Sequence, residues 1–111
     1  MKVQIAAAAC GCVLALVLTP ARAAIDDAKG AALLKSGGCV TCHSVEKKLV
    51  GPAFKDVAAK HKGDPDAVAK LAKIVRAGGK GVYGPVPMPP NPVGKISDAD
   101  LHDVLEWVLT K

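Results

Sequence analysis

Apolar residues recur at helical spacing in four segments of the chain, and no segment shows the sustained alternation of a half-buried strand. The clearest segment is the last, which is expected to begin at Ser97 because Ser97 and Asp100, three positions on, resemble a capping box. Trp107 lies on the apolar side of this helix and is expected in the core. The apolar stripe consists of Leu101, Val104, Leu105 and Val108. The pattern therefore predicts an all-α fold.

The first of three shorter helices is expected at Ala28–Lys35. Asp26 and Asp27 precede it, and acidic residues at a helix N-terminus interact favourably with the helix dipole. Gly37 and Gly38 are expected to end the helix. The apolar face that this helix would bury consists of Ala28, Ala31, Ala32 and Leu34.

The second and third helices lie in the middle of the chain. The second covers Phe54–His61 and is ended by Gly63. The third is expected to open at Pro65, because proline is favoured in the first turn of a helix, and to end at Gly78. Its helical stripe consists of Val68, Leu71, Ile74 and Val75.

A long segment without helical or strand pattern separates the last two helices, from Gly78 to Lys95. Five of the chain's eight prolines fall within Pro85–Pro92. Because proline fixes its own backbone angle and lacks an N–H donor, this loop can be stiff without a hydrogen-bond ladder. A long loop in so small a domain is usually functional or disordered.

The first 23 residues have the pattern of a secretory signal peptide. Lys2 precedes an apolar run at Val3–Leu18 that only Gln4 interrupts, and Ala21 and Ala23 form an A-x-A cleavage pattern. We expect cleavage after Ala23, export to the periplasm, and one domain at residues 24–111. The alternative is an uncleaved anchor, since about 17–25 apolar residues can span a bilayer.

Composition indicates that the core lacks large side chains. Only three of the 111 residues are aromatic, Phe54, Tyr83 and Trp107, and a domain of this size buries only about 60–65% of its unfolded surface. A large apolar group is therefore expected to complete the core. Two of the 15 basic residues and none of the 10 acidic ones lie in the leader, so the formal charge falls from +5 to +3 on its removal. A charge of that size is too weak to indicate nucleic-acid binding.

Two cysteines remain after removal of the leader, and they belong to the motif Cys39-Val40-Thr41-Cys42-His43. C-x-x-C-H is the attachment pattern of c-type haem, in which two thiols form thioethers with vinyl groups and the adjacent histidine reaches the iron. A thioredoxin-like pair would require a βαβ pattern, and a zinc site would require a second close pair of ligands. The sequence has neither, so one covalently bound haem c is predicted.

The second axial ligand of such a haem is expected to be Met88. Histidine–methionine ligation is common in electron-transferring cytochromes, and Met88 is the only methionine left once Met1 is removed with the leader. The alternatives are His61, at a polar helix end, and His102, beside the apolar stripe of the last helix. The competing interpretation of Met88 itself is a core residue that fills a gap.

Likeness to known proteins extends beyond the haem motif into the loops. The segments concerned are 39–43 (CVTCH), 50–60 (VGPAFKDVAAK), 81–91 (GVYGPVPMPPN) and 107–109 (WVL). In them the chain resembles the small bacterial cytochrome c-551 family of class I c-type cytochromes, and the resemblance covers essentially all of residues 24–111. It implies a class I cytochrome c fold, with about four short helices around one covalent haem and the first and last helices crossing.

The resemblance implies that Cys39 and Cys42 hold the haem and that His43 and Met88 ligate its iron. With both axial positions filled, no position is open for a substrate, so an electron carrier rather than an enzyme is expected. The implied role is periplasmic one-electron transfer between a cytochrome-reducing membrane complex and a terminal reductase, such as nitrite reductase, or an oxidase. The protein is expected to be a monomer and to reach the membrane only through these partners.

Three further residues are implied to support the haem. The carbonyl of Pro52 would orient His43 through its other ring nitrogen and so fix the tautomer. Asn91 would hydrogen-bond near the methionine sulfur. Tyr83 stands where the family often has a tryptophan that donates to a haem propionate, and its hydroxyl could replace that donor.

The resemblance also implies a docking surface where the haem edge nears the protein surface. Small interfaces suit transient redox encounters, and lysines would steer association in a salt-dependent way. Two alternatives to a free carrier are a haem-based sensor or catalytic protein with a displaceable methionine, and an electron-entry subunit of a larger complex. The implied surface consists of the apolar residues Val40, Val50 and Val86, ringed by Lys35, Lys47, Lys48 and Lys55.

Overall fold

The computed structural model describes residues 18 and 22–111 of the chain. Among these residues every regular element is a helix, which confirms the all-α prediction. Most of the predicted leader lies outside the described residues, and no helix within them is long and apolar enough to cross a membrane. The elements are α1 (Asp27–Ser36), the short 3₁₀ helix η1 (Cys39–Thr41), α2 (Phe54–Lys60), α3 (Ala67–Ala77) and α4 (Asp98–Val108).

Side-chain caps fix where the first and last helices begin. The Asp26 carboxylate accepts a hydrogen bond of 2.7 Å from the backbone N–H of Lys29, and the Ser97 hydroxyl accepts one of 3.1 Å from the N–H of Asp100. Each bond satisfies one of the N–H groups that a helix leaves unpaired in its first turn. The predicted start of α4 is therefore confirmed, and α1 extends one residue beyond its predicted range at either end.

The prediction that Pro65 opens the third helix is wrong. The Asp64 carboxylate accepts a 2.9 Å hydrogen bond from the N–H of Asp66, two residues on. This local turn competes with helix formation, so Pro65 lies in the turn and α3 begins at Ala67.

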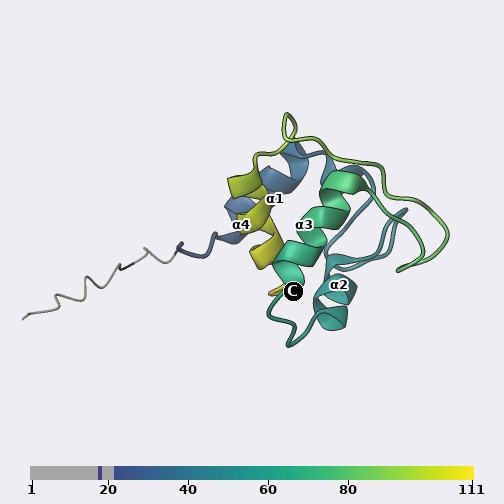
Figure 1. Ribbon diagram of the computed structural model, residues 1–111, viewed down its shortest axis with the longest axis horizontal. Helices are drawn as coiled ribbons and strands as arrows, with labels where there is room; N and C mark the ends of the chain where they lie inside the picture. The colour runs from purple at the N-terminus through teal and green to yellow at the C-terminus, as the bar shows by residue number, and fades with distance from the viewer. Residues whose placement is uncertain (1–17, 19–21) are drawn as a thin grey trace, which may run out of the picture.

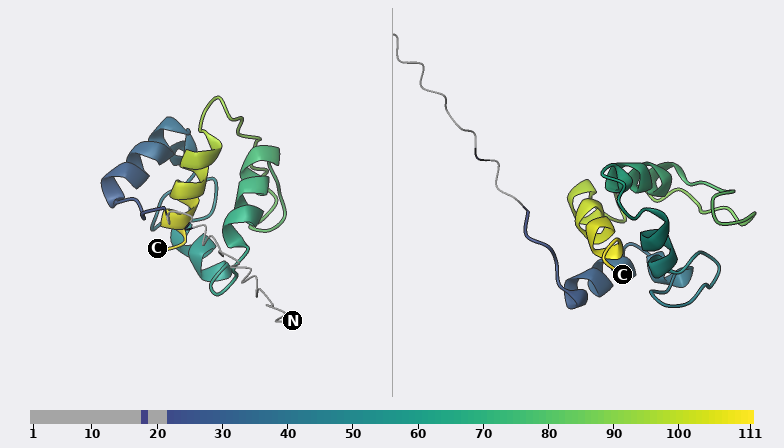
Figure 2. Two further views of the ribbon diagram at one scale, coloured as in Figure 1. Left: turned by 60° about the vertical axis from the view of Figure 1, so that its left-hand side comes forward. Right: turned by 90° about the horizontal axis from the view of Figure 1, so that it is seen from below.

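The helices form a small cluster around α4 (Figures 1 and 2). α4 packs against α1, α2 and α3. Parts of both long connections, residues 42–53 and 78–97, extend to the right-hand side of this cluster in Figure 1, and the second then crosses the top of the view to reach α4. The two connections that carry predicted site residues therefore reach one side of the molecule together.

The predicted apolar stripe of α4 forms the centre of the core. All four of its residues are buried, and Trp107 is buried beside them as expected. Of the predicted α3 stripe only Leu71 is buried, and the other three residues are half-buried. The core cluster consists of Leu33, Leu34, Phe54, Val57, Leu71, Ile96, Leu101, Val104, Leu105, Trp107 and Val108.

The predicted buried face of α1 is wrong for its three alanines, which are all exposed. The helix instead buries Gly30, Leu33 and Leu34. A Cβ atom added to Gly30 would lie 2.5 Å from Cε2 of Trp107. The absence of a side chain at residue 30 therefore lets the indole of α4 lie directly on the backbone of α1, and this contact rotates the alanines toward solvent.

Polar contacts also hold α1 against α4 at the edge of the place where the two helices cross. Oδ1 of Asp27 accepts a hydrogen bond of 2.9 Å from the indole N–H of Trp107 and another of 2.9 Å from Nζ of Lys111. The Lys111 ammonium also lies 3.8 Å from the centre of the Trp107 ring, within the range of a cation–π interaction. Residues from both ends of the folded domain thus meet at one carboxylate.

These contacts predict how stability depends on pH. The hydrogen bond from Lys111, followed by that from Trp107, lowers the pKa of Asp27 below its ordinary value of 3.8. A lowered folded-state pKa contributes stability above the unfolded pKa, and this contribution is lost as pH falls through the folded value. We expect Asp27→Asn to lower the urea midpoint at pH 7 and the deficit to shrink as the pH falls below about 4. Asp66→Asn is the control, because the Asp66 side chain makes no capping hydrogen bond; a deficit for Asp27→Asn that persists unchanged at pH 2 would contradict the prediction.

Candidate functional site

The two cysteines of the C-x-x-C-H motif lie on a single turn directly after α1. Gly38 has a φ of 75°, a left-handed conformation that glycine adopts without strain, and it turns the chain from α1 into η1. The N–H groups of Cys42 and His43 both donate to the carbonyl of Cys39, at 3.3 and 3.0 Å. The turn therefore presents two thiols and an imidazole from five consecutive residues.

Both thiols are free and half-buried. Burial raises the pKa of the Cys39 thiol above its ordinary value of 9.0. Cysteines that bind zinc or act as nucleophiles need the thiolate form, which electropositive surroundings favour and apolar burial opposes. Cys39 is thus in a poor environment for a thiolate.

The imidazole of His43 contacts Pro52, just before α2, and Phe54, the first residue of α2. Its Nδ1 lies 2.8 Å from the carbonyl oxygen of Pro52, and its ring stacks on Phe54 with 5.1 Å between centroids and 17° between planes. Since a carbonyl only accepts hydrogen bonds, Nδ1 is the donor in this bond, and in the neutral imidazole Nε2 then keeps its lone pair. This is the tautomer that a metal-binding histidine with a carbonyl partner requires.

Gly51 makes room for that imidazole, because a Cβ atom on Gly51 would collide with Cε1 of His43. We expect Gly51→Ala to push the ring off the Pro52 carbonyl and to destabilise the protein by about 1–3 kcal/mol. The measurement is the free energy of unfolding from a urea titration, which should fall. Gly94→Ala is the control, since a Cβ there meets nothing within 4 Å; equal free energies for the two variants would contradict the prediction.

Met88 is fixed at the backbone by the end of α3. Its N–H donates to the carbonyl of Gly79 at 2.7 Å, and the N–H of Gly79 donates back at 3.1 Å. Gly78, with a φ of 75°, allows this close approach, because a Cβ on it would lie 2.6 Å from the Met88 carbonyl oxygen. The half-buried Met88 therefore occupies a defined position in a loop that contains little other regular structure.

Two buried oxygen atoms beside these loops have no hydrogen-bond partner among the described residues. They are the Tyr83 hydroxyl and Oδ1 of Asn91. Nδ2 of Asn91 donates at 2.9 Å to the carbonyl of Gly37, two residues before Cys39, and not to the Met88 sulfur. Burial, and secondarily the negative charge of Asp56, raises the pKa of Tyr83, so its hydroxyl keeps its proton and is available as a donor.

The two histidines considered as alternative ligands both lie beside carboxylates. His61 ends α2, with Nδ1 4.0 Å from the carboxylate of Asp64. His102 lies on α4 beside Asp103 and Glu106, within 3.7 and 3.8 Å of their carboxylates. Both face acidic groups, whereas Met88 belongs to the loop that Asn91 ties to the cysteine turn.

Six large apolar side chains are exposed on η1 and the two connections. Each is about half exposed, although apolar side chains of this size are usually buried. Lys35, Lys47 and Lys48 are exposed as well, and Lys55 pairs with Glu46 at 3.3 Å. The exposed apolar residues are Val40, Leu49, Val50, Val82, Val86 and Val93.

The chemistry of these groups fits a covalently attached haem. Cys39 and Cys42 offer two free thiols on one turn, and His43 keeps Nε2 available for a metal. Met88 offers a thioether from a fixed loop position. The unpartnered Tyr83 hydroxyl suits a carboxylate such as a haem propionate.

Sequence reasoning missed two residues that shape the site, Gly51 and Phe54. Phe54 had been considered only as the start of a helix, and the stack on His43 joins residues eleven positions apart. The sequence pattern assigns no role to Gly51. The adjacent carbonyl partner of the histidine gives the only sequence clue that Gly51 makes space for the ring.

Comparison with known proteins gives consistent matches. Residues 28–111 match the family model described as cytochrome c. The chain is 49% identical to cytochrome c-551 of Pseudomonas aeruginosa over 79 residues, 71% of this chain and 73% of that protein. The crystal structure of wild-type cytochrome c552 from Nitrosomonas europaea superposes with a TM-score of 0.67 at 48% identity, covering 72% of this chain and 96% of the other. The class 1 cytochrome MtoD from Sideroxydans lithotrophicus gives a TM-score of 0.65 at 31% identity, covering 78% and 97%.

Proposed function

Since this chain belongs to the cytochrome c family, we propose that it shuttles single electrons in the periplasm between a cytochrome-reducing membrane complex and a terminal reductase, such as nitrite reductase, or an oxidase. It is a small class I cytochrome with one covalently attached haem c, and an electron carrier rather than an enzyme. The electron donor, the electron acceptor and the periplasmic location are what we propose.

The proposal assigns the haem attachment to Cys39 and Cys42 and the axial iron ligands to His43 and Met88. The observation that supports it is that His43 and Met88 are each held in a defined position, within the two connections that reach the same side of the molecule. His43 is held through Nδ1 by Pro52, and Met88, the one methionine among the described residues, is held through its backbone.

A haem held by these residues would supply one-electron chemistry, through the ferric and ferrous states of its iron. His43 and Met88 would occupy both axial positions, so no coordination position would be free for a substrate. Methionine as the second ligand raises the reduction potential relative to a second histidine. The rigid hold on both ligands keeps their positions similar in the two oxidation states, which suits rapid electron transfer.

The exposed valines and lysines are proposed as the partner-docking surface. Val40, Val50 and Val86 would provide the apolar centre, and lysines such as Lys47 and Lys48 would attract an acidic partner surface. The proposed leader, residues 1–23, would direct the chain to the compartment of these partners, and a mature N-terminus at Ala24 is its expected product.

The experiment uses the haem-loaded protein and purified nitrite reductase or a terminal oxidase, with electron transfer followed by stopped flow. We expect the second-order rate to fall with increasing salt. At low salt, Lys47→Glu combined with Lys48→Glu should slow the reaction several-fold, because both residues would contribute to steering. Lys62→Glu combined with Lys73→Glu is the charge-matched control, at two exposed lysines outside the proposed surface.

A second measurement separates this role from a sensor or a catalytic haem protein. The native ferrous carrier should not bind carbon monoxide rapidly, because Met88 would occupy the sixth position. Rapid binding of carbon monoxide would contradict the proposed shuttle. So would a rate of electron transfer that changes neither with salt nor in the variant that combines Lys47→Glu with Lys48→Glu.

A further inference from the structure

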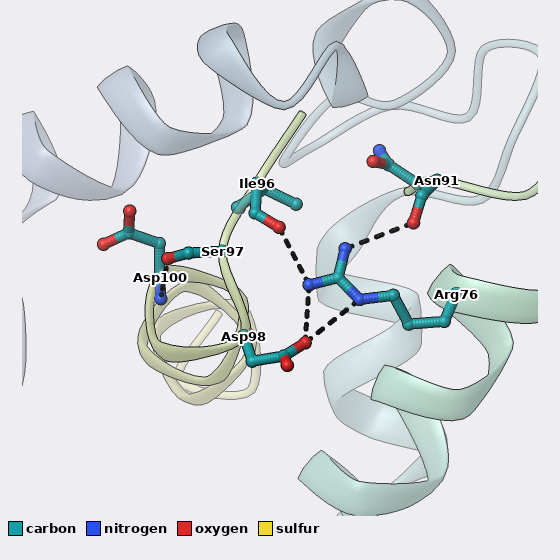
Figure 3. A network of polar contacts seen from close by, with 6 residues as sticks. All are labelled: Arg76, Asn91, Ile96, Ser97, Asp98 and Asp100. Atoms are coloured by element: carbon teal, nitrogen blue, oxygen red, sulfur yellow. Dashed lines mark hydrogen bonds and ion pairs between the residues drawn. The ribbon is translucent and has the colours of Figure 1, made fainter. Parts of the chain in front are cut away.

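Arg76 in the last turn of α3 joins three parts of the chain through one guanidinium group (Figure 3). Nη1 donates to the carbonyl of Asn91 at 3.1 Å, and Nη2 donates to the carbonyl of Ile96 at 2.8 Å. Nε and Nη2 also donate to Oδ1 of Asp98, at 3.2 and 2.8 Å. The side chain is only 21% exposed, so this cation lies largely within the fold and contacts both ends of the segment that links the Met88 loop to α4.

The Asn91 end of this network is stiffly connected to Met88. Asn91 is anchored a second time by its N–H, which donates to the carbonyl of Val75 at 2.9 Å. Only Pro89 and Pro90 separate it from Met88. Each proline has a fixed φ angle, and each restricts the residue before it to extended backbone. A displacement of Asn91 is therefore transmitted to Met88 instead of being absorbed between them.

We propose that Arg76 is a positioning residue for the Met88 thioether, which it holds on the iron against competing ligands by fixing the Asn91 end of the loop. This inference rests on the proposed axial role of Met88. The hydrogen bonds between Met88 and Gly79 hold the loop from the other direction. Both anchors, the Gly79 hydrogen bonds and the Arg76 network, lie at the C-terminal end of α3, so the loop and that helix move as one unit.

The geometry requires arginine in particular. The planar guanidinium presents several N–H donors in a fixed fork, and this one serves two backbone carbonyls and a carboxylate at once. A lysine ammonium can keep the charge beside Asp98 but cannot reach all three acceptors with the same fixed orientation. Arg76→Lys is therefore the conservative variant, because it keeps the positive charge and removes the fixed arrangement of N–H donors.

The experiment measures the affinity of imidazole for the ferric, haem-loaded protein, because imidazole competes with a thioether for the sixth position. The apparent affinity rises in proportion to the population in which the native ligand is detached. We expect imidazole to bind Arg76→Lys about three- to tenfold more tightly than wild type, and Arg76→Gln at least as tightly as Arg76→Lys. Lys73→Gln, on an exposed residue one turn earlier in α3, should bind imidazole as wild type does.

Val104→Ala separates positioning from general stability, because Val104 lies in the core and not in the loop. It should lower the urea midpoint without changing the imidazole affinity. Wild-type imidazole affinity in Arg76→Lys, or equal increases in Arg76→Lys and Val104→Ala, would overturn the proposal. Failure of the Met88 assignment has a different signature, since Met88→Ala would then leave the far-red region of the ferric spectrum unchanged whatever the Arg76 variants do.

Discussion

Replacement of Met88 by alanine is expected to abolish the far-red sulfur-to-iron charge-transfer band of the ferric protein. The reduction potential should fall by on the order of 0.1 V or more, because axial ligands set haem potentials over a range of about 0.8 V and methionine favours the ferrous state. The measurements are the ferric absorption spectrum and a potentiometric titration. The ferrous variant should also gain carbon monoxide binding, since the sixth position becomes accessible.

Controls for this prediction come from the same loop and from the alternative ligands. Val86→Ala changes an exposed residue two positions away and should leave the band intact. His61→Ala and His102→Ala should also keep it, because both side chains face carboxylates. A band that survives in Met88→Ala, or disappears in either histidine variant, would reject Met88 as the ligand.

A single methyl group at Gly30 is expected to destabilise the protein by about 2 kcal/mol through overpacking. Alanine would ordinarily stabilise a helix by about 1 kcal/mol relative to glycine. Here the added Cβ would lie 2.5 and 2.6 Å from two carbon atoms of the Trp107 indole, far inside van der Waals contact. The free energy of unfolding from urea titration of the haem-loaded protein measures the net effect.

A double-mutant cycle identifies the indole as the cause. Gly30→Ala should cost less in a Trp107→Leu background than in wild type, because the shorter side chain leaves room for the methyl group. Lys29→Ala, at an exposed neighbouring position of α1, should have little effect. Equal costs of Gly30→Ala in both backgrounds would show that the helices do not cross as closely as the structure has them.

Local chemistry made part of the fold predictable. The α4 stripe and its Ser97 cap depend on residues three or four positions apart, so spacing alone identifies them. The C-x-x-C-H motif is equally local, because its two thiols and imidazole share one turn. These features were read correctly because the interactions that create them lie within a few residues.

The errors occurred where distant contacts decide the outcome. Helical spacing alone favoured the alanine face of α1, whereas a tryptophan more than seventy positions away selects Gly30. Pro65 satisfied the rule for a helix start, but the Asp64 side chain held its turn outside α3. No spacing rule singles out Arg76, because only the folded chain brings Asn91 and Ile96 to it.

The closure of the domain at Asp27 has a consequence for how this fold can be used. Its first helix starts, and its last residues end, at the same carboxylate. The N- and C-terminal ends of the domain therefore lie close together, which is the condition for its insertion into a surface loop of a larger protein. The fold is thus suited to serve as a built-in electron relay within a multidomain oxidoreductase, and circular permutants with new ends at the exposed turn around Gly63 should still fold.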